Sequence, residues 1–232
     1  VAFALQALIS LAMTPIIVRA LGERMYGFWT LVGTFVGYYG IMDMGVSSAV
    51  TRYVSRALGQ QDEEEINRVA STSFFLFTGV AVLVVLVTVA VAFLSFLVVR
   101  DAAEYRVVRL LLLVLGARVA LSFPARVFAG MLNAHLRHDL TACATMAQLL
   151  AGNGCIYLFL RHGGSVLGMS LLVLGAALIE YLLNLASALR VFPKLVLSRG
   201  MAQRKAFSTI FHYSGKTVDR KSTRLNSSHG KL

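Results

Sequence analysis

The chain has 232 residues, of which 57% are apolar and only 14% are charged, and its formal net charge is +11. A water-soluble domain carries about 25% charged residues because its surface must face water. The composition therefore excludes a soluble globular domain and indicates an integral membrane protein. Most Lys and Arg residues lie at the ends of long apolar runs, which is typical of membrane topology signals and argues against a nucleic-acid partner.

Six apolar stretches reach or approach the 20 or so residues that a helix needs to cross a bilayer. No stretch alternates polar and apolar residues as the strands of a membrane barrel do. The predicted fold class is therefore all-α, a polytopic transmembrane helical bundle with six spans. The spans are expected at about residues 1–20, 26–54, 71–99, 107–132, 140–160 and 165–191.

The second predicted span contains an intramembrane carboxylate, Asp43, and a GxxxG pair made by Gly33 and Gly37. Small residues at this spacing predict close helix contact and bending. Three interpretations of Asp43 remain open from the sequence. It could neutralise an arginine, carry a coupling proton, or stabilise a bent helix.

The third predicted span is preceded by four acidic residues, 62–65. Asp followed three residues later by Glu is a capping box, and acids are favoured at the positive end of the helix dipole. A calcium or substrate site is the alternative, but capping accounts for all four acids. His135 and His138 lack a Cys, Asp or Glu at metal-ligand spacing, and the sequence contains no P-loop, HExxH or GxSxG motif. We therefore predict no enzyme activity, no catalytic residue, no metal and no cofactor.

The fourth predicted span carries Arg118 near its middle, where a charge costs about 2.5–3.5 kcal/mol on insertion scales. Ser122 and Arg126 follow at i+4 and i+8, so the three side chains form a polar stripe along one flank of the helix. Pro124 is expected to kink this helix. A structural ion pair for Arg118 and a snorkelling position for Arg126 are the alternatives to a functional role.

The sixth predicted span carries Glu180, with Asn184 one turn later. A buried carboxylate needs a cation or a proton, and Arg118 is a suitable partner by chemistry. The sequence does not show whether the two side chains meet.

The loop charges predict the orientation of the bundle, since Lys and Arg are enriched on the cytoplasmic side. They favour cytoplasmic connections after the second, fourth and sixth spans and a periplasmic connection at residues 161–164. Residues 192–218 form a basic cytoplasmic linker, either a helix on an anionic leaflet or a loop toward a seventh span. Residues 219–232 resemble a translated sequencing adapter and are expected to be a non-native tail on a fragment that begins inside an apolar run.

Four local motifs stand out along the chain. They are PIIVRALG at residues 15–22, YGFW at 26–29, Asp43-Met-Gly45 with Ala49 and Arg52, and Pro124 followed by GMLN at 130–133. The first three resemble the opening of polysaccharide biosynthesis and O-antigen-type flippases, and the fourth is similar to the fourth helix of that family. These flippases belong to the multidrug/oligosaccharidyl-lipid/polysaccharide (MOP) exporter superfamily, and the resemblance covers about residues 1–218.

The resemblance implies that residues 1–191 form the first of two bundles around a central cavity. It implies a flippase that moves polyprenyl-diphosphate-linked oligosaccharide across the bacterial inner membrane by alternating access. The expected partners are this substrate, the lipid bilayer and the polysaccharide assembly machinery. A drug/cation antiporter of the same superfamily and an integral-membrane glycosyltransferase or polymerase are the alternatives.

The same resemblance implies roles for individual charged residues. Arginine binds phosphate oxygens through a planar, two-pronged guanidinium group, which suits a diphosphate. Asp43 and Glu180 are expected either to couple transport to an ion or to form structural ion pairs. The expected substrate-binding residues are Arg118, Arg126, Arg52 and Arg19.

Overall fold

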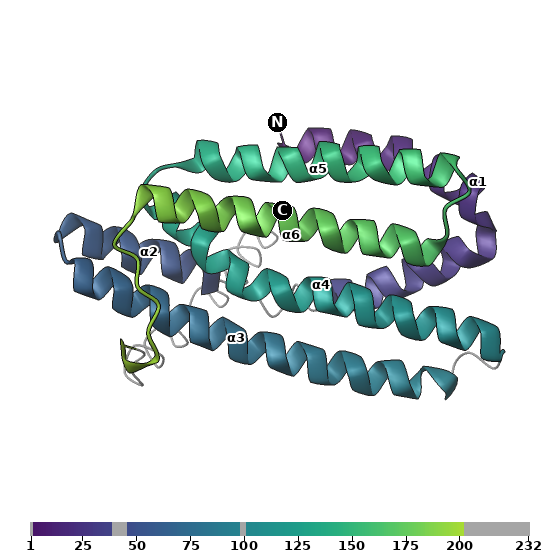
Figure 1. Ribbon diagram of the computed structural model, residues 1–232, viewed down its shortest axis with the longest axis horizontal. Helices are drawn as coiled ribbons and strands as arrows, with labels where there is room; N and C mark the ends of the chain where they lie inside the picture. The colour runs from purple at the N-terminus through teal and green to yellow at the C-terminus, as the bar shows by residue number, and fades with distance from the viewer. Residues whose placement is uncertain (1, 39–45, 98–100, 202–232) are drawn as a thin grey trace, which may run out of the picture.

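The computed structural model describes residues 2–38, 46–97 and 101–201, and all regular structure in these ranges is helical. Figure 1 shows the long helices packed side by side along one common direction. The all-α bundle predicted from the sequence is thereby confirmed. Its elements are α1 (Ala2–Gly37), α2 (Val46–Gly59), α3 (Glu63–Leu94), η2 (Ser95–Leu97), α4 (Ala102–Ala134), α5 (His138–Arg161), α6 (Val166–Val191) and η3 (Arg199–Met201).

Five helices among the described residues are long and apolar enough to cross a membrane, whereas the sequence analysis expected six spans. The difference arises at the start of the chain, where the single candidate span Leu5–Thr34 takes in both helical segments of α1. The predicted second span is divided between the end of α1 and α2, and residues 39–45, including Asp43, lie outside the described ranges.

Helix α1 is not straight, because Gly22 interrupts it with φ 77° and ψ 159°. Glycine adopts a positive φ without the steric cost that a Cβ atom imposes. Two helical segments therefore meet at Gly22, and in Figure 1 the purple ribbon reaches one end of the bundle and turns back there. This turn lies between the first two predicted spans, as expected from the sequence.

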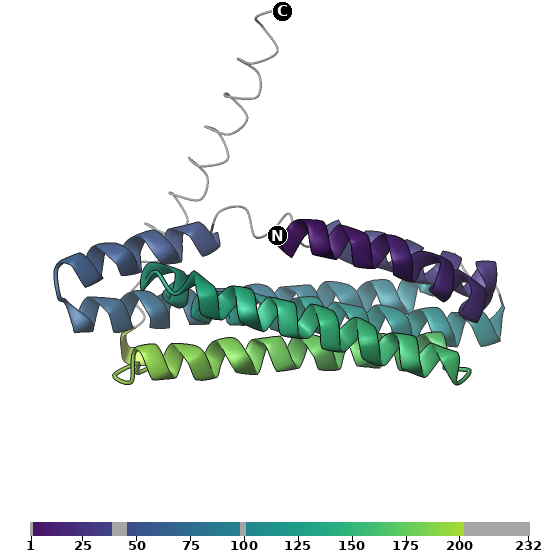
Figure 2. The same cartoon turned by 90° about the horizontal axis from the view of Figure 1, so that it is seen from above.

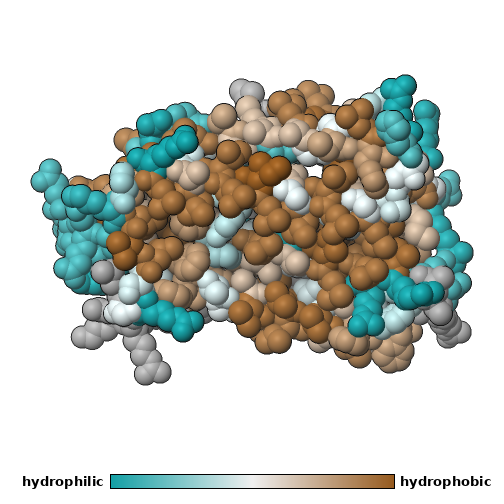
Figure 3. All heavy atoms as spheres, in the orientation of Figure 1, coloured by the Kyte–Doolittle hydropathy of each residue, from teal (hydrophilic) through white to brown (hydrophobic). Residues whose placement is uncertain are grey.

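The surface of the bundle is apolar in the middle and polar at its two ends. In Figure 3 the brown residues cover the central part of the visible face, and the teal residues gather at the two ends. Large apolar side chains such as Leu86, Leu171 and Leu182 are more than half exposed. A soluble protein would not expose such a surface, whereas a multi-pass membrane protein buries it in lipid.

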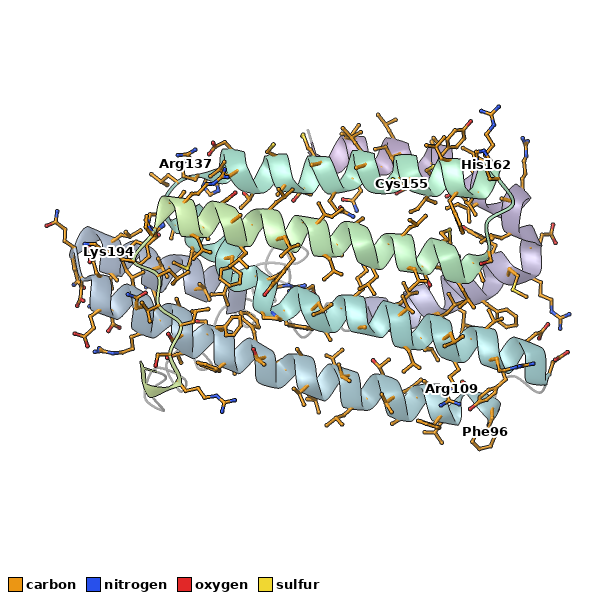
Figure 4. The ribbon with its side chains drawn as sticks, in the orientation of Figure 1. Phe96, Arg109, Arg137, Cys155, His162 and Lys194 are labelled. Carbon is orange, nitrogen blue, oxygen red and sulfur yellow. The ribbon has the colours of Figure 1, made fainter. Side chains whose placement is uncertain are left out.

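The helix connections alternate between the two ends of the bundle. Figure 4 shows Arg137 and Lys194 at one end, and Arg109 and His162 at the other. The α2–α3 connection, the α4–α5 connection and the end of α6 all lie at the first of these ends (Figure 1). This agrees with the prediction that these three connections share one side of the membrane; which side is cytoplasmic stays a prediction.

The N-terminus of α3 has the predicted cap. The Asp62 carboxylate accepts a hydrogen bond from the backbone N–H of Glu65 at 2.9 Å. The side chains of Glu64 and Glu65 bind Arg68 at 2.7 and 2.6 Å, so the reciprocal half of the capping box is replaced by ion pairs within the helix. Glu63 instead binds Lys194 beyond the end of α6 at 2.8 Å. Capping and ion pairing thus use all four acids.

The segment that follows α6 is fastened to α3 by side chains one turn apart. The amide of Asn67 donates to the carbonyl of Lys194 at 3.1 Å and accepts from the N–H of Val196 at 2.9 Å. The hydroxyl of Ser71 donates to the Val196 carbonyl and accepts from the Ser198 N–H, both at 3.2 Å. The first residues of the predicted linker therefore belong structurally to the bundle. The rest of that linker, 202–218, and the predicted tail, 219–232, lie outside the described residues.

Candidate functional site

A cavity of about 530 Å³ lies between α1, α4 and α6. Seen from above in Figure 2, α1 and α2 lie along one face of the bundle and α6 along the opposite face. Helix α4 supplies the largest share of the cavity wall, with residues between Leu115 and Ala129, while Trp29 to Gly37 of α1 and Val173 to Asn184 of α6 complete it. Most of the lining is apolar, so its few charged side chains dominate its chemistry.

Arg118 and Arg126 of α4 both line this cavity. Eight residues correspond to slightly more than two helical turns, so the two side chains lie about 12 Å apart along the helix axis and about 80° apart around it. The Nε of Arg118 is buried and has no hydrogen-bond partner in the described part of the chain. The guanidinium carbon of Arg126 lies 5.1 Å from the centre of the Phe123 ring, within the range of a cation–π contact.

Ser122 also lines the cavity between the two arginines, but its hydroxyl donates to the carbonyl of Val119 at 2.7 Å. This bond stays within α4 and does not neutralise either cation. Helix α4 continues through Pro124, which has no N–H to give to the carbonyl one turn earlier. Arg118, Ser122 and Arg126, which form the polar stripe expected from the sequence, thus all line one cavity.

Glu180 is an acidic residue of the cavity wall, and its partner in the structure is a threonine. Thr145 of α5 donates to Glu180 Oε1, with an oxygen–oxygen distance of 2.8 Å. In the described ranges no Glu180 oxygen lies within 4.0 Å of an Arg118 nitrogen. The structural Arg118–Glu180 ion pair considered from the sequence is thus not formed in this structure.

Aromatic and amide side chains complete the polar part of the wall. Trp29 comes from α1, and Tyr181 from α6 packs edge-on against Phe128 with ring centres 6.0 Å apart. Asn184 is buried, and its Oδ1 has no hydrogen-bond partner in the described part of the chain. This oxygen is therefore a further polar atom of the wall that no described group satisfies.

The GxxxG pair, Gly33 and Gly37, belongs to the wall of the cavity. A Cβ atom at Gly33 or Gly37 would have no heavy-atom neighbour within 4 Å in the described part of the chain, and both residues line the cavity. The close helix contact predicted at these glycines is thus not formed with any described residue. Their missing side chains widen the cavity beside α1 instead.

The remaining predicted site residues lie elsewhere. Arg19 on α1 and Arg52 on α2 are exposed and are not part of the wall of this cavity. Asp43 lies outside the described residues. The structure thus brings together Arg118, Arg126 and Glu180, and the binding roles predicted for all these residues stay predictions.

The histidines next to the end of α4 have local partners. The Nδ1 of His135 lies 2.8 Å from the carbonyl oxygen of Met131, and the Nδ1 of His138 lies 2.8 Å from Asn133 Oδ1. Within the described ranges, no group of three or more His, Cys, Asp and Glu side chains is arranged to hold a metal ion.

Sequence reasoning did not single out Thr145, Trp29 or Tyr181 as parts of a site. A lone threonine in an apolar helix carries no motif, and its contact with Glu180 depends on how α5 is rotated against α6. Trp29 belongs to the YGFW motif, and Tyr181 directly follows Glu180, so proximity to singled-out residues was the available signal.

Comparisons with known proteins agree with this architecture. The model of the MatE family matches residues 1–158. The uncharacterized membrane protein EpsK of Bacillus subtilis (strain 168) is 35% identical over 66 residues, which are 28% of this chain and 13% of that protein. No solved structure matches the chain. Since the family match covers more than half of the sequence, the chain belongs to the MatE family, within the MOP exporter superfamily.

Proposed function

We propose that the protein is a membrane transporter that moves polyprenyl-diphosphate-linked oligosaccharide, a polysaccharide precursor, across the membrane by alternating access. The observation that carries the proposal is the charge of the cavity. Two arginines and a single carboxylate line it among the described residues, so this described part of the wall carries a net positive charge. An anionic headgroup is the substrate that such a wall attracts.

The chemistry of the two arginines suits a diphosphate. Each guanidinium group can give two parallel hydrogen bonds to phosphate oxygens, and these bonds are stronger where water is scarce. Arg118 and Arg126 follow one another along α4, so they can hold successive positions of a headgroup that moves along the helix. The polyprenyl chain would remain in the lipid beside the apolar outer surface of the bundle.

The size of the cavity also supports a headgroup ligand. Its volume of about 530 Å³ falls within the roughly 300–1,000 Å³ of typical small-molecule sites. A diphosphate with one or two sugar rings fits this space, whereas a longer oligosaccharide would extend beyond it. Trp29 and Tyr181 offer flat apolar faces of the kind on which sugar rings stack.

A drug/cation antiporter of the same superfamily is the nearest alternative. A cationic drug would require acidic residues in excess, whereas the described lining contains two cations and one acid, Glu180. A glycosyltransferase or polymerase would require a catalytic cluster of acids or histidines. We therefore favour the lipid-linked saccharide.

The proposal includes a cellular location and partners for the protein. Its location would be the bacterial cytoplasmic membrane, supported by the partial similarity to a Bacillus subtilis membrane protein. The alignment spans only 13% of that relative, so a second bundle completing the transport path is part of the proposal. The polysaccharide assembly machinery would supply the substrate on one side and use it on the other.

The proposal is tested with the full-length protein in proteoliposomes. A fluorescent polyprenyl-diphosphate oligosaccharide should move between leaflets, as measured by its accessibility to a membrane-impermeant quencher. An uncharged polyprenol of the same chain length and a cationic dye are the controls and should not be moved. Transport of the dye without movement of the lipid-linked saccharide would favour the antiporter.

A further inference from the structure

We propose that Thr145 is a positioning residue that holds Glu180 away from Arg118 and so keeps Arg118 available for an anionic substrate. This inference rests on the proposed function, because it concerns binding of an anion in the same cavity. It assigns a role to a side chain that lies on α5, outside the cavity wall.

The first argument is the geometry of the carboxylate. Glu180 is part of the cavity wall together with Arg118, yet its Oε1 accepts the hydroxyl of Thr145 at 2.8 Å. No Arg118 nitrogen lies within 4.0 Å of a Glu180 oxygen among the described residues. Glu180 is thus directed toward α5 although a cation is present in the same cavity.

The second argument is the unused capacity of the arginine. The Nε of Arg118 is buried without a hydrogen-bond partner in the described part of the chain. A guanidinium group with an unsatisfied, buried N–H attracts a carboxylate that can reach it. Glu180 shares the cavity wall with Arg118, and the hydrogen bond from Thr145 therefore competes with pairing between the two charges.

The third argument is the neutrality of the donor. A lysine at position 145 would hold Glu180 more strongly, but it would also add a charge at the border of the cavity. The threonine hydroxyl stabilises the carboxylate and leaves the balance of two cations to one anion in the described lining unchanged. Glu180 then offsets part of the cost of two half-buried cations without occupying the site of the substrate.

Binding of a short polyprenyl diphosphate tests this inference. Farnesyl diphosphate would be titrated into the detergent-solubilised full-length protein, with farnesol as the uncharged control. Replacing Thr145→Val should weaken binding about tenfold, because Glu180 then pairs with Arg118 and must be displaced. Thr145→Ser keeps the hydroxyl and should bind like the unchanged protein.

A second variant separates positioning from packing. Glu180→Gln removes the competing charge, so Thr145→Val should have no further effect in that background. Equal weakening by Thr145→Val with and without Glu180→Gln would overturn the inference, and so would unchanged binding by Thr145→Val alone.

Arg118→Ala distinguishes failure of the proposed function from failure of the role of Thr145. If it leaves farnesyl diphosphate binding unchanged, the anion site itself is wrong; if it abolishes binding while Thr145→Val does not weaken it, only the role of Thr145 fails.

Discussion

Gly116 of α4 lies directly against the side chain of Thr88 of α3. A Cβ atom built at Gly116 would come within 2.6 Å of Thr88 Oγ1 and 2.9 Å of Thr88 Cβ, closer than real Cβ contacts allow. Small residues let helices approach closely in membranes, where packing rather than water exclusion drives association. Arg118 is two residues further along α4, about 200° around the helix, so this contact turns the arginine away from α3 and toward the cavity.

Replacing Gly116→Ala is therefore expected to separate α3 from α4. Overpacking of a tight interface costs about 1–3 kcal/mol, so the variant should unfold at a lower temperature than the unchanged protein in the same detergent. Gly154→Ala on α5 is the matched control, because a Cβ there meets no heavy atom of the described residues within 4 Å. Equal unfolding temperatures for both variants would show that α3 and α4 are not this close.

The attachment of the segment after α6 can be tested at Asn67. Asn67→Ala removes both side-chain bonds to the backbone of residues 194–196 and leaves a carbonyl and an N–H without their partner. A loss of about 1–3 kcal/mol is expected, together with faster proteolytic cleavage near Ser198.

The control for that experiment is Asn153→Ala on α5. Asn153 donates only to the carbonyl of Leu149 in its own helix, at 2.7 Å. Its removal should leave both the unfolding temperature and the cleavage rate nearly unchanged. Cleavage that is equally slow in both variants would mean that the Asn67 bonds do not fasten the segment.

The predicted orientation can be measured by cysteine labelling of intact cells. The native Cys143 and Cys155 are both exposed, so they must first be replaced by alanine. In that background His162→Cys should react with an impermeant thiol reagent, because the α5–α6 connection is predicted to be periplasmic. Gln60→Cys at the opposite end should react only after the membrane is opened. The reverse pattern would invert the topology.

Much of the fold could be predicted from the sequence because a bilayer imposes a simple length requirement on apolar runs. The boundaries were less predictable where polar residues continue a helix. Helix α3 begins at Glu63 rather than near residue 71, since the capped acidic turn extends it beyond the apolar run. The turn at Gly22 lies between the first two predicted spans and was therefore expected. The division of the second predicted span between α1 and α2 was not expected, because residues 26–54 form one mostly apolar stretch in the sequence.

The candidate site was only partly predictable. The i, i+4, i+8 spacing of Arg118, Ser122 and Arg126 predicted one shared flank, and all three line one cavity. The partner of Glu180 could not be predicted, since the contact with Thr145 joins residues 35 positions apart and depends on helix rotation. The open space beside Gly33 could not be predicted either, because GxxxG spacing alone does not show whether another helix packs there.

The central claim is that the cavity arginines bind the phosphates of the substrate, and translocation by arginine variants tests it most directly. The full-length protein carrying Arg118→Ala with Arg126→Ala would be compared in proteoliposomes with Arg137→Ala, whose side chain is exposed and pairs with Asp139 at 3.1 Å. Each charged hydrogen bond is worth about 1.5–3 kcal/mol, so the double variant should flip the fluorescent lipid-linked saccharide at least about tenfold more slowly. Arg118→Lys should be intermediate, because an ammonium group lacks the two-pronged geometry. A stably folded double variant that flips the lipid as fast as the Arg137→Ala control would contradict the claim.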